Sequence, residues 1–585
     1  MKLKLYIYCI LFMLANISLA QTDSDVNNRT DIALVESIYI HTNASLVFSG
    51  EYLYYSIYCF DTTTKKLSNL SKMAYVELIS SSGERVFRHK IRLEKGRGYS
   101  DFFVPVDLQT GNYKLIGYTN WMQNTDLNFF GNVEINIINP YKVTLDETSI
   151  VSNSIVNSNQ RDSFNKVNVK DNQIVLELDK ANFKSREKAV ISISTKDINE
   201  NGFNGSYSLS VKRKSTIPQP KSLSSISYLN TLKPEFVRIS NLDNNAKLPE
   251  LRGELFKGII KGLDNTFAQG LNISISFPNE TNLLRIARVN ANGEFYFNVN
   301  SFYFTEEVYF QIIEKNIQDY SIELKPKNQP DLSRLEFNEF SSKPEWKEEI
   351  INQSIYNQIE NAYFEFRSDS LYIGNKKDLL EGKDYELYNL EDYNRFPTLK
   401  ETIKEFVSKI SVRRDVNLGE VFEIQGLGFD TKTGIRPLVL MDGILVDDHN
   451  KLMDYNANYI KEIKIYRNQL VIDLQEFQGA MVINTIEGFD KNEFLQNGFF
   501  NQQKIETPQF QKTYYLQKYD ESNRSSRLPD YRQQLLWMPN INVMETNNLE
   551  IEFYTSDVKG DFEIRLEGFT DEGMPVSIMK EFKVN

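Results

Sequence analysis

Short runs of alternating apolar and polar residues recur along most of this chain. Every second side chain is apolar from residue 74 to 78, and the runs at 87–93, 549–553 and 562–566 repeat the pattern. A period of two residues places successive side chains on opposite faces of a β-strand. The sequence therefore predicts a mainly β protein in which each sheet buries one face.

Composition agrees with folded β-rich domains. Aromatic residues make up 12% of the chain, with 32 Tyr and 38 Phe, and such residues favour strands over disorder. A length of 585 residues allows roughly four domains of ~150 residues each. The formal net charge of −12 and the lack of a basic block argue against a general nucleic-acid-binding role.

The first residues have the pattern of a secretory signal peptide. Two lysines precede an apolar run from Leu5 to Ile17, and Ser18-Leu-Ala20 stands before Gln21. We expect cleavage after residue 20 and export, because the apolar run is shorter than the ~20 residues of a membrane-spanning helix. Since residue 21 is not cysteine, we expect no lipid anchor, and attachment to a membrane only through partners.

The cysteines predict no internal disulfide. Cys9 lies in the predicted signal peptide, which leaves Cys59 alone. Cys59 is in phase with apolar residues of a predicted strand at 53–59, so we expect a buried thiol rather than a nucleophile.

Polar stretches divide the chain into modules. Residues 21–36 are a predicted polar lead, 145–172 a linker, and 214–248 an irregular stretch. The predicted parts are a signal peptide at 1–20, a β-sandwich at 37–140, a second β module at 173–215 that extends irregularly to 248, a third β-sandwich at 249–325, a small α/β domain at 395–490, and a C-terminal β segment at 525–585.

Two local signals are specific in the α/β part. Thr398 and Glu401 form a capping-box pattern before apolar residues at helical spacing, which predicts a helix over 399–410. Asp442-Gly443 between two apolar runs predicts a tight hairpin turn. Near the C-terminus, the segment 555–560 is predicted to join strands at 549–554 and 561–567 as a hairpin.

The β modules resemble known exported bacterial domains. Residues 37–138, with Ser37-Ile-Tyr-Ile-His41 and Gly117-Tyr-Thr-Asn-Trp121-Met122, resemble a macroglobulin-type domain. The second module, through Tyr207-Ser-Leu-Ser-Val211, resembles a following macroglobulin-like domain. The third, through Asn292-Gly293, resembles a carboxypeptidase-regulatory-like β-sandwich, and Leu536-Trp537 lies in a segment similar to the end of the same architecture.

The segment 437–486 resembles another family. Its runs 437–446, 460–467 and 479–486 are similar to the plug domain of TonB-dependent outer-membrane transporters. The resemblances together imply tandem macroglobulin- or Ig-like β-sandwich modules plus a small α/β plug-like domain. The part after residue 490 has room for few strands, whereas a transporter barrel needs on the order of 22, so we do not expect transport. The Gly-Cys-Gly-Glu-Gln motif of thioester macroglobulins is also missing.

No residue set predicts catalysis, a cofactor or a metal. His41, His89 and His449 lack metal-ligand spacing, and His89 shares a strand face with apolar residues. The chain lacks a Gly-x-Ser-x-Gly motif, and Gly426-Leu-Gly428 is a lone Gly-x-Gly. We therefore predict no catalytic, cofactor-binding or metal-ligating residue.

Acidic pairs and aromatic residues are weaker candidates for binding. The pairs Asp447-Asp448 and Glu348-Glu349 are compatible with calcium or acid–base chemistry, but a solvated surface is the favoured interpretation in a chain with 79 acidic residues. Four aromatic residues are candidates for stacking on sugars, although rings in such modules mostly fill cores. These are Tyr303, Phe304, Tyr309 and Phe310.

Three functions remain as hypotheses. The leading one is a non-enzymatic accessory or scaffold subunit of a Gram-negative outer-membrane complex for nutrient transport, secretion or barrel assembly. Its partners would be an outer-membrane β-barrel protein, surface lipoproteins, or both. The alternative is a secreted or surface adhesin or glycan-binding protein. The third is a hydrolase whose site escapes motif analysis.

Overall fold

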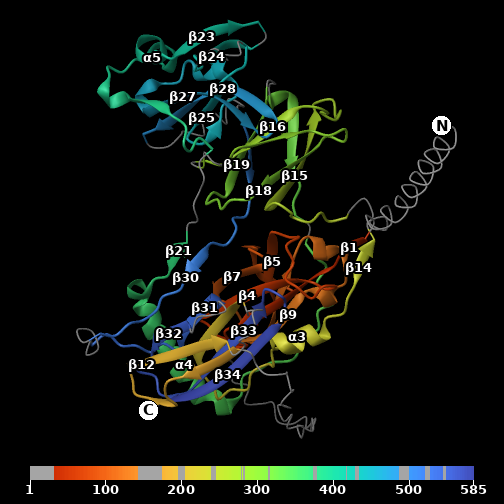
Figure 1. Cartoon of the computed structure of the whole chain (residues 1–585), viewed down its shortest axis with the longest axis vertical. Coiled ribbons are helices and arrows are strands. Elements are labelled where there is room, and N and C mark those ends of the chain that lie inside the picture. The colour runs from red at the N-terminus through yellow and green to blue at the C-terminus, as the bar shows by residue number, and fades with distance from the viewer. Residues whose placement is uncertain are drawn as a thin grey trace, which may run out of the picture. The chain divides into compact units, whose positions relative to one another are not determined.

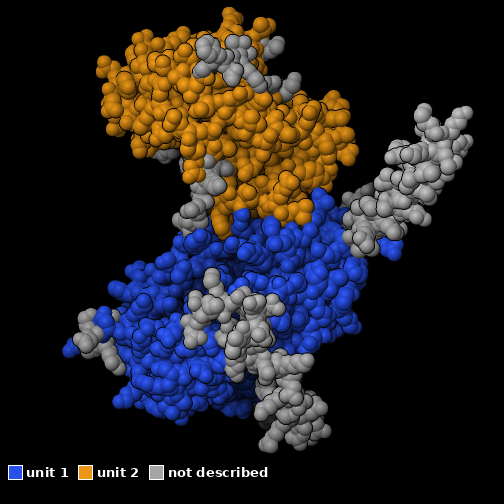
Figure 2. All heavy atoms as spheres, in the orientation of Figure 1, with its two compact units in different colours: residues 1–249, 330–372, 509–585 blue, residues 250–329, 373–508 orange. Residues whose placement is uncertain are grey.

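The chain forms two compact units, each assembled from separate stretches of sequence (Figures 1 and 2). Unit 1 comprises residues 1–249, 330–372 and 509–585, and unit 2 comprises residues 250–329 and 373–508. The computed structural model describes residues 32–142, 174–195, 204–238, 246–278, 280, 283–313, 317–327, 329–372, 379–416, 418–427, 434–486, 500–520, 527–543 and 549–585. The predicted signal peptide and the predicted linker at 145–172 lie outside these residues.

The first module of unit 1 is a β-sandwich. One sheet has the order β2-β4-β7 and the other β3-β9-β8-β5-β6, with antiparallel pairing except between β3 and β9. The strands are β2 Glu36–Thr42, β3 Leu46–Phe48, β4 Tyr52–Asp61, β5 Met73–Ser80, β6 Arg85–Arg92, β7 Arg97–Phe103, β8 Gly111–Tyr118 and β9 Gly131–Ile138.

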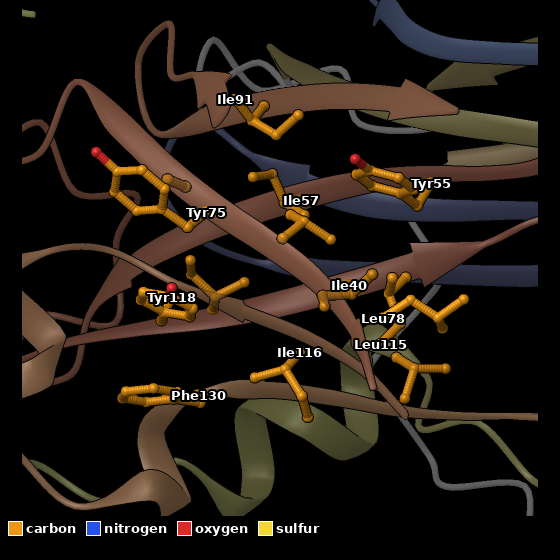
Figure 3. Packing of buried hydrophobic residues seen from close by; sticks show 14 of the residues in the cluster. Ile40, Tyr55, Ile57, Tyr75, Leu78, Ile91, Leu115, Ile116, Tyr118 and Phe130 are labelled. Atoms are coloured by element: carbon orange, nitrogen blue, oxygen red, sulfur yellow. The ribbon is translucent and has the colours of Figure 1, made fainter. Parts of the chain in front are cut away.

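The core of this sandwich uses the predicted alternation. Ala74, Val76 and Leu78 of β5 are completely buried. Figure 3 shows side chains of both sheets meeting in this core, and the rings of Tyr118 and Phe130 lie stacked there with centroids 5.2 Å apart. The period-two pattern therefore fixes which face of β5 points inward.

The second sandwich combines residues from both ends of unit 1. Its sheets have the orders β10-β12-β32 and β11-β34-β33-β13-β31. The strands are β10 Ile174–Leu178, β11 Asn182–Phe183, β12 Lys188–Thr195, β13 Gly205–Arg213, β31 Gln534–Val543, β32 Leu549–Tyr554, β33 Gly560–Thr570 and β34 Pro575–Val584. The stretches 173–215 and 525–585, which the sequence pattern presents as two parts, thus build one hydrophobic core.

The hairpin predicted through residues 555–560 is wrong. β32 pairs with β12, whereas β33 pairs with β13 and β34 in the opposite sheet. The connecting segment crosses between the sheets, and Thr555 anchors it by donating to the Lys184 carbonyl at 2.7 Å. Alternation alone does not distinguish a hairpin from this crossing, because both place the same residues in the core.

Shorter elements complete unit 1. The predicted polar lead contributes β1 (Ile32–Leu34), which pairs with β14 (Phe236–Arg238) inside the stretch expected to be irregular. That stretch also forms α3 (Ser225–Thr231). Residues 330–372 add α4 (Lys347–Ala362) and β21 (Ser370–Tyr372), which pairs with β30 (Gln511–Thr513). The sequence interpretation missed all of these elements.

Unit 2 begins with a third sandwich. Its sheets have the orders β18-β15-β20 and β17-β16-β19-β29 around an aromatic core. The strands are β15 Glu254–Gly262, β16 Asn272–Ser276, β17 Arg285–Arg288, β18 Glu294–Val299, β19 Glu307–Ile312, β20 Tyr320–Leu324 and β29 Asn501–Lys504. The predicted turn at Asn292-Gly293 precedes β18, and Gly293 adopts a positive φ of 74°.

The second part of unit 2 is a small α/β domain. Its five-stranded sheet has the order β22-β27-β28-β25-β26, and β25 and β28 are parallel. The elements are β22 Tyr385–Asn389, α5 Leu399–Phe406, β23 Ile410–Asp415, β24 Gly419–Ile424, β25 Leu438–Met441, β26 Ile444–Leu445, α6 His449–Leu452, β27 Ile460–Ile472 and β28 Gln475–Thr485. The mainly β fold class with tandem β-sandwich modules is thus confirmed.

The predicted local signals of this domain are present. The Thr398 hydroxyl accepts from the Glu401 amide and the reciprocal bond closes the capping box, but the helix ends at Phe406. Ile410 instead begins β23, so the predicted end at 410 is too late. Asp442 and Gly443 have φ of 46° and 82°, the geometry of a type I′ turn, which confirms the hairpin.

The shared core of the second sandwich leads to a stability prediction. Leu566 of β33 is fully buried opposite Leu209 of β13. We expect Leu566→Ala to destabilise unit 1 by about 2–5 kcal/mol, because it leaves a cavity. All three tryptophans (Trp121, Trp346 and Trp537) lie in unit 1, so urea unfolding followed by tryptophan fluorescence measures this loss.

Phe295→Ala is the matched control for that measurement. Phe295 is fully buried in the core of unit 2, and its truncation is expected to leave the tryptophan transition unchanged. If Leu566→Ala unfolded at the same urea concentration as the parent protein, the proposed core that joins the two ends of unit 1 would be contradicted.

The turn at Asp442 leads to a second prediction. The Asp442 carboxylate accepts from the Thr485 amide at 2.9 Å and from its hydroxyl at 2.6 Å. Asp442→Ala is expected to cost about 1–3 kcal/mol, since Thr485 is buried and loses its acceptor. Asp442→Asn keeps an acceptor and tolerates the positive φ, so it is expected to lose less. The hydrogen-exchange rates of the β25 and β28 amides measure the stability of both variants. Equal losses of stability in the two variants would disprove the role of the Asp442 carboxylate as the acceptor for Thr485.

Candidate functional site

The structure separates the three histidines. His41 Nδ1 lies 2.5 Å from Ser208 Oγ, and burial together with Arg565 lowers its pKa. Burial lowers the pKa of His89 and of His449 to about 3, with lesser contributions from nearby cationic side chains. His89 is partly buried and lies 2.9 Å from the Tyr55 hydroxyl, as expected from its strand phase. No cluster of His, Cys, Asp or Glu that could hold a metal ion occurs within the described residues.

Cys59 is a buried strand thiol, as predicted. It lies in β4 with no exposed surface, and burial raises the pKa of its thiol, with Glu36 adding to the effect. Such a thiol is a poor nucleophile because it holds its proton.

The acidic pairs do not form shared sites. Asp447 forms a 2.5 Å ion pair with Arg436, whereas Asp448 lies 3.6 Å from Lys451. Glu349 pairs with Arg213 at 2.7 Å, while Glu348 is exposed on the first turn of α4.

Three of the four predicted sugar-stacking residues fill cores. Tyr303, Tyr309 and Phe310 are buried, and the Tyr303 hydroxyl donates to Glu254 at 2.6 Å. Phe304 is 42% exposed. The structure therefore does not assemble the predicted aromatic set into one surface.

A different site begins at helix α4, whose polarity is inverted. After Ile350, which is buried, the inward positions are the polar Gln353, Ser354 and Asn357, whereas Ile351 and Ile355 are 48% and 46% exposed, so the inversion is partial. Helices usually bury their apolar stripe. Amide side chains that point inward therefore indicate that hydrogen-bonding groups lie beneath the helix. Tertiary packing decides which face of residues 347–362 points inward, so the sequence alone does not show this inversion.

Beneath this face lies a cavity of about 160 Å³, which we call the amide–aromatic pocket. Its walls come from the start of β4, from α4 and the residues after it, from residues 514–515, and from residues 531–537 at the start of β31. The lining residues used below are Gly50, Glu51, Tyr52, Tyr54, Lys212, Asn357, Glu360, Asn361, Phe364, Arg367, Asp369, Tyr514, Tyr515, Tyr531, Arg532, Gln533 and Trp537.

Four N–H groups of the lining have no acceptor among the described residues. They are Asn357 Nδ2, Arg367 Nε, Gln533 Nε2 and Trp537 Nε1, and each parent residue is no more than 9% exposed. A buried donor without an acceptor costs about 1–3 kcal/mol. These four nitrogens have almost no accessible surface themselves, so they lie behind the wall of the cavity rather than open to it.

A buried ion network supports one side of the pocket. Arg532 donates to both oxygens of Asp530 at 2.7 Å, and the Tyr519 hydroxyl donates to the same carboxylate at 2.7 Å. Arg367 pairs with Glu360 and lies 3.9 Å from Asp530. Burial is the largest single influence and acts to raise the pKa of Asp530, but Arg532, Tyr519 and Arg367 together hold this pKa below its ordinary value.

Aromatic rings form the other wall. Tyr52 stacks on Tyr54 with centroids 5.7 Å apart and on Phe364 at 6.2 Å. Tyr54 stacks on Trp537 at 5.8 Å and meets the edge of Tyr514 at 5.0 Å. Burial raises the pKa of Tyr52 to about 12, so its hydroxyl stays protonated at neutral pH.

The glycine at the rim lets the helix approach β4. Gly50 has φ of 91°, and its carbonyl accepts from Asn361 Nδ2 at 3.0 Å. A Cβ at this position would lie 3.1 Å from the same amide nitrogen, so a larger residue would strain both the turn and the pocket wall.

Comparisons with known proteins leave the family open. No protein-family model matches the sequence, and no curated protein matches it. Among solved structures, Salmonella alpha-2-macroglobulin reacted with methylamine is 8% identical with a TM-score of 0.24, over 95% of this chain and 40% of that chain. Escherichia coli alpha-2-macroglobulin activated by porcine elastase is 10% identical with a TM-score of 0.24, over 94% and 44%.

An adhesin is also among the similar structures. The Escherichia coli adhesin FdeC is 12% identical with a TM-score of 0.14, over 32% of this chain and 51% of that chain. The chain spans about 40% of the length of the Salmonella macroglobulin. Similarity at these levels carries no conclusion about function. No helix among the described residues is long and apolar enough to cross a membrane.

The ion network leads to a prediction with a pH dependence. Asp530→Asn is expected to cost about 3–5 kcal/mol at pH 7, because it leaves the buried Arg532 guanidinium without its carboxylate. The lowered pKa of Asp530 means that its stabilising effect is present above the unfolded-state pKa and is lost as the pH falls through the folded-state pKa. Tryptophan-detected unfolding at pH 7 and in strong acid measures this change.

An exposed ion pair in the same unit serves as the control. Glu572 pairs with Lys66 at the surface, and Glu572→Gln is expected to change the stability of unit 1 by less than about 1 kcal/mol. If Asp530→Asn changed the stability of unit 1 at pH 7 as little as Glu572→Gln does, the ion network would not support the pocket.

Proposed function

We propose that this protein is a non-catalytic binding protein of the bacterial cell envelope, and that its amide–aromatic pocket holds part of a ligand. The observation that carries the proposal is the cavity of about 160 Å³ itself, which is lined by Phe364, 42% exposed, and by the neighbouring ring of Tyr52. The cavity is lined by stretches far apart in the sequence, among them residues 50–54, 357–369 and 531–537, so the fold brings its walls together.

The carboxylates around the pocket favour binding over acid–base chemistry. Glu360 accepts from Arg367 and from the Tyr531 amide at 2.6 Å, and Asp369 accepts from the Tyr515 amide at 2.9 Å. Glu51 accepts from Lys212 at 3.3 Å. Burial raises the pKa of both Glu360 and Asp369, but each carboxylate is already held by donors of the protein.

For the biological setting, we propose an accessory or scaffold subunit of a Gram-negative outer-membrane complex. The signal-peptide pattern supports export, and the plug-like sequence of residues 437–486 supports docking to an outer-membrane β-barrel protein or a surface lipoprotein. Unit 2 carries that segment and is inserted into the chain of unit 1, so neither unit is released by a single cut between domains.

A secreted or surface adhesin, or a glycan-binding protein, is the second candidate. The neighbouring rings of Tyr52, Tyr54 and Phe364 favour it, because an aromatic wall of a cavity suits the apolar face of a sugar as well as a protein group. Both proposed functions use the same pocket. They differ in one respect, because only the accessory subunit requires a stable partner in the outer membrane.

Purification from native outer membranes tests the setting. A tagged full-length chain is expected to co-purify with one β-barrel protein or lipoprotein in a fixed ratio, and the tagged partner should recover this chain in return. A variant that lacks the predicted signal peptide is the control, since it should not reach the partner. Recovery of the exported chain free of any membrane partner would reject the accessory role.

A further inference from the structure

We propose that His41 makes the packing of the first sandwich of unit 1 against the second sandwich sensitive to acid. His41 lies in β2 of the first sandwich, and its Nδ1 lies 2.5 Å from Oγ of Ser208 in β13 of the second. The His41 ring also lies beside Trp537 of β31, with ring centroids 5.5 Å apart. This inference goes beyond the proposed binding function, because it concerns the contact between two sandwiches rather than a ligand.

The hydrogen bonds of this contact show which ring nitrogen carries the proton. The Ser208 hydroxyl has one proton, which it donates to the Glu567 carbonyl at 3.2 Å. The Ser208 oxygen therefore accepts from Nδ1–H of His41, and the neutral ring leaves Nε2 unprotonated. Nε2 is thus the nitrogen that gains a proton when His41 becomes charged.

The packed interface offers no acceptor for that proton. His41 is 3% exposed, and its Nε2 has no hydrogen-bond partner among the described residues. An N–H group that is buried without an acceptor costs free energy, and a buried charge without a partner costs more. The packed interface therefore holds His41 neutral, whereas separation of the sandwiches lets water reach the ring.

The titratable groups around His41 do not offset this cost. Burial lowers the pKa of His41, and the guanidinium of Arg565 in β33 lowers it further. The Tyr58 hydroxyl of β4 stays neutral, since burial raises its pKa to about 12. Lys212 of β13 is paired with Glu51 at 3.3 Å, and β31 carries no titratable side chain.

Glu567 is the carboxylate that β33 brings to this interface. It accepts from the Tyr39 hydroxyl at 3.3 Å, from the Ser225 amide at 2.9 Å and from the Ser577 hydroxyl at 2.7 Å. Burial raises the pKa of Glu567. A carboxyl whose pKa is raised in the packed state stabilises that state in acid, so Glu567 acts against His41 and the experiment has to separate the two groups.

Through His41, acid favours separation of the two sandwiches. An exposed histidine has a pKa of about 6.5, and His41 in the packed interface has a pKa below that value. Such a histidine stabilises the packed state above about pH 6.5, and this effect is lost as the pH falls. The equilibrium constant for separation then rises by up to about tenfold per pH unit, which gives about twentyfold between pH 7 and pH 5.

Thiol labelling of the full-length chain tests the inference. Ser56 is 1% exposed and donates across the interface to the Pro539 carbonyl at 3.3 Å, so Ser56→Cys places a thiol where separation of the sandwiches exposes it. Cys9→Ala and Cys59→Ala leave it as the single thiol of the chain. The labelling rate with dithiodipyridine is measured at pH 7 and pH 5, each time relative to the urea-unfolded chain at the same pH.

We expect the rise in relative labelling rate from pH 7 to pH 5 to be about twentyfold larger in the single-thiol chain than after a further His41→Gln or His41→Phe substitution. Glu567 titrates in all of these chains, so its effect cancels in the comparison. His89→Gln is the matched control, because His89 lies in the same sandwich against Tyr55, and burial lowers its pKa as well. His89→Gln is expected to keep the full rise.

Two results would overturn the inference. One is an equal rise with and without His41. The other is a rise that His89→Gln removes as His41→Gln does, because the thiol would then be exposed by unfolding of the first sandwich rather than by its separation from the second. Far-UV circular dichroism shows which variants remain folded, and two different substitutions of His41 keep the test decisive if one of them does not fold.

Discussion

The pairing of β13 with strands from the far end of the chain is the constraint on which unit 1 depends. β13 lies between β31 and β33 in its sheet, and Ser206 hydrogen-bonds to Asn540, which lies 334 residues later. Without the C-terminal strands, β13 would expose both edges and one half of its core. The entropic cost of closing a loop grows only slowly with the length of the loop. An insertion as long as unit 2 therefore adds little to the free-energy cost of bringing β13 and the C-terminal strands together. The pocket depends on the same pairing, because residues 531–537 supply one of its walls.

Buried polar contacts hold the two sandwiches of unit 1 in one arrangement. Tyr39 donates to Glu567 at 3.3 Å, and Tyr58 and His41 both contact Ser208, at 3.2 and 2.5 Å. Polar groups in such an interface lose their partners if the surfaces slide, and each unpaired buried group costs free energy. β4 therefore keeps a defined position against β31. The two aromatic sides of the pocket, Tyr54 on one strand and Trp537 on the other, come from these elements.

The sequence predicts structural features that depend on neighbouring residues, and it misses those that depend on contacts between residues far apart in the chain. The capping box at Thr398 and the turn at Asp442 follow from local side-chain chemistry, and the alternating runs predict which residues are buried. An alternating pattern shows which residues of a strand face the core, but not which strand pairs with it in the sheet. The sequence therefore predicts a hairpin where the chain instead crosses from β32 in one sheet to β33 in the other. The pocket was missed for the same reason, since its donors come from separate parts of the chain. The orientation of α4, with Asn357 inside and Ile351 outside, is set by the same distant packing and has no local signal in the sequence.

The same geometry links ligand binding to the stability of unit 1. A ligand bound in the cavity as proposed would touch α4, β4 and β31, three stretches that meet only in the folded state. The unfolded chain does not offer these groups together, so the ligand binds the folded form selectively and adds RT ln(1 + [L]/Kd) to its stability. The four unpaired N–H groups behind the cavity wall make this region less stable than a fully hydrogen-bonded interior would be, so selective binding to the folded form would add stability where the fold has least to spare.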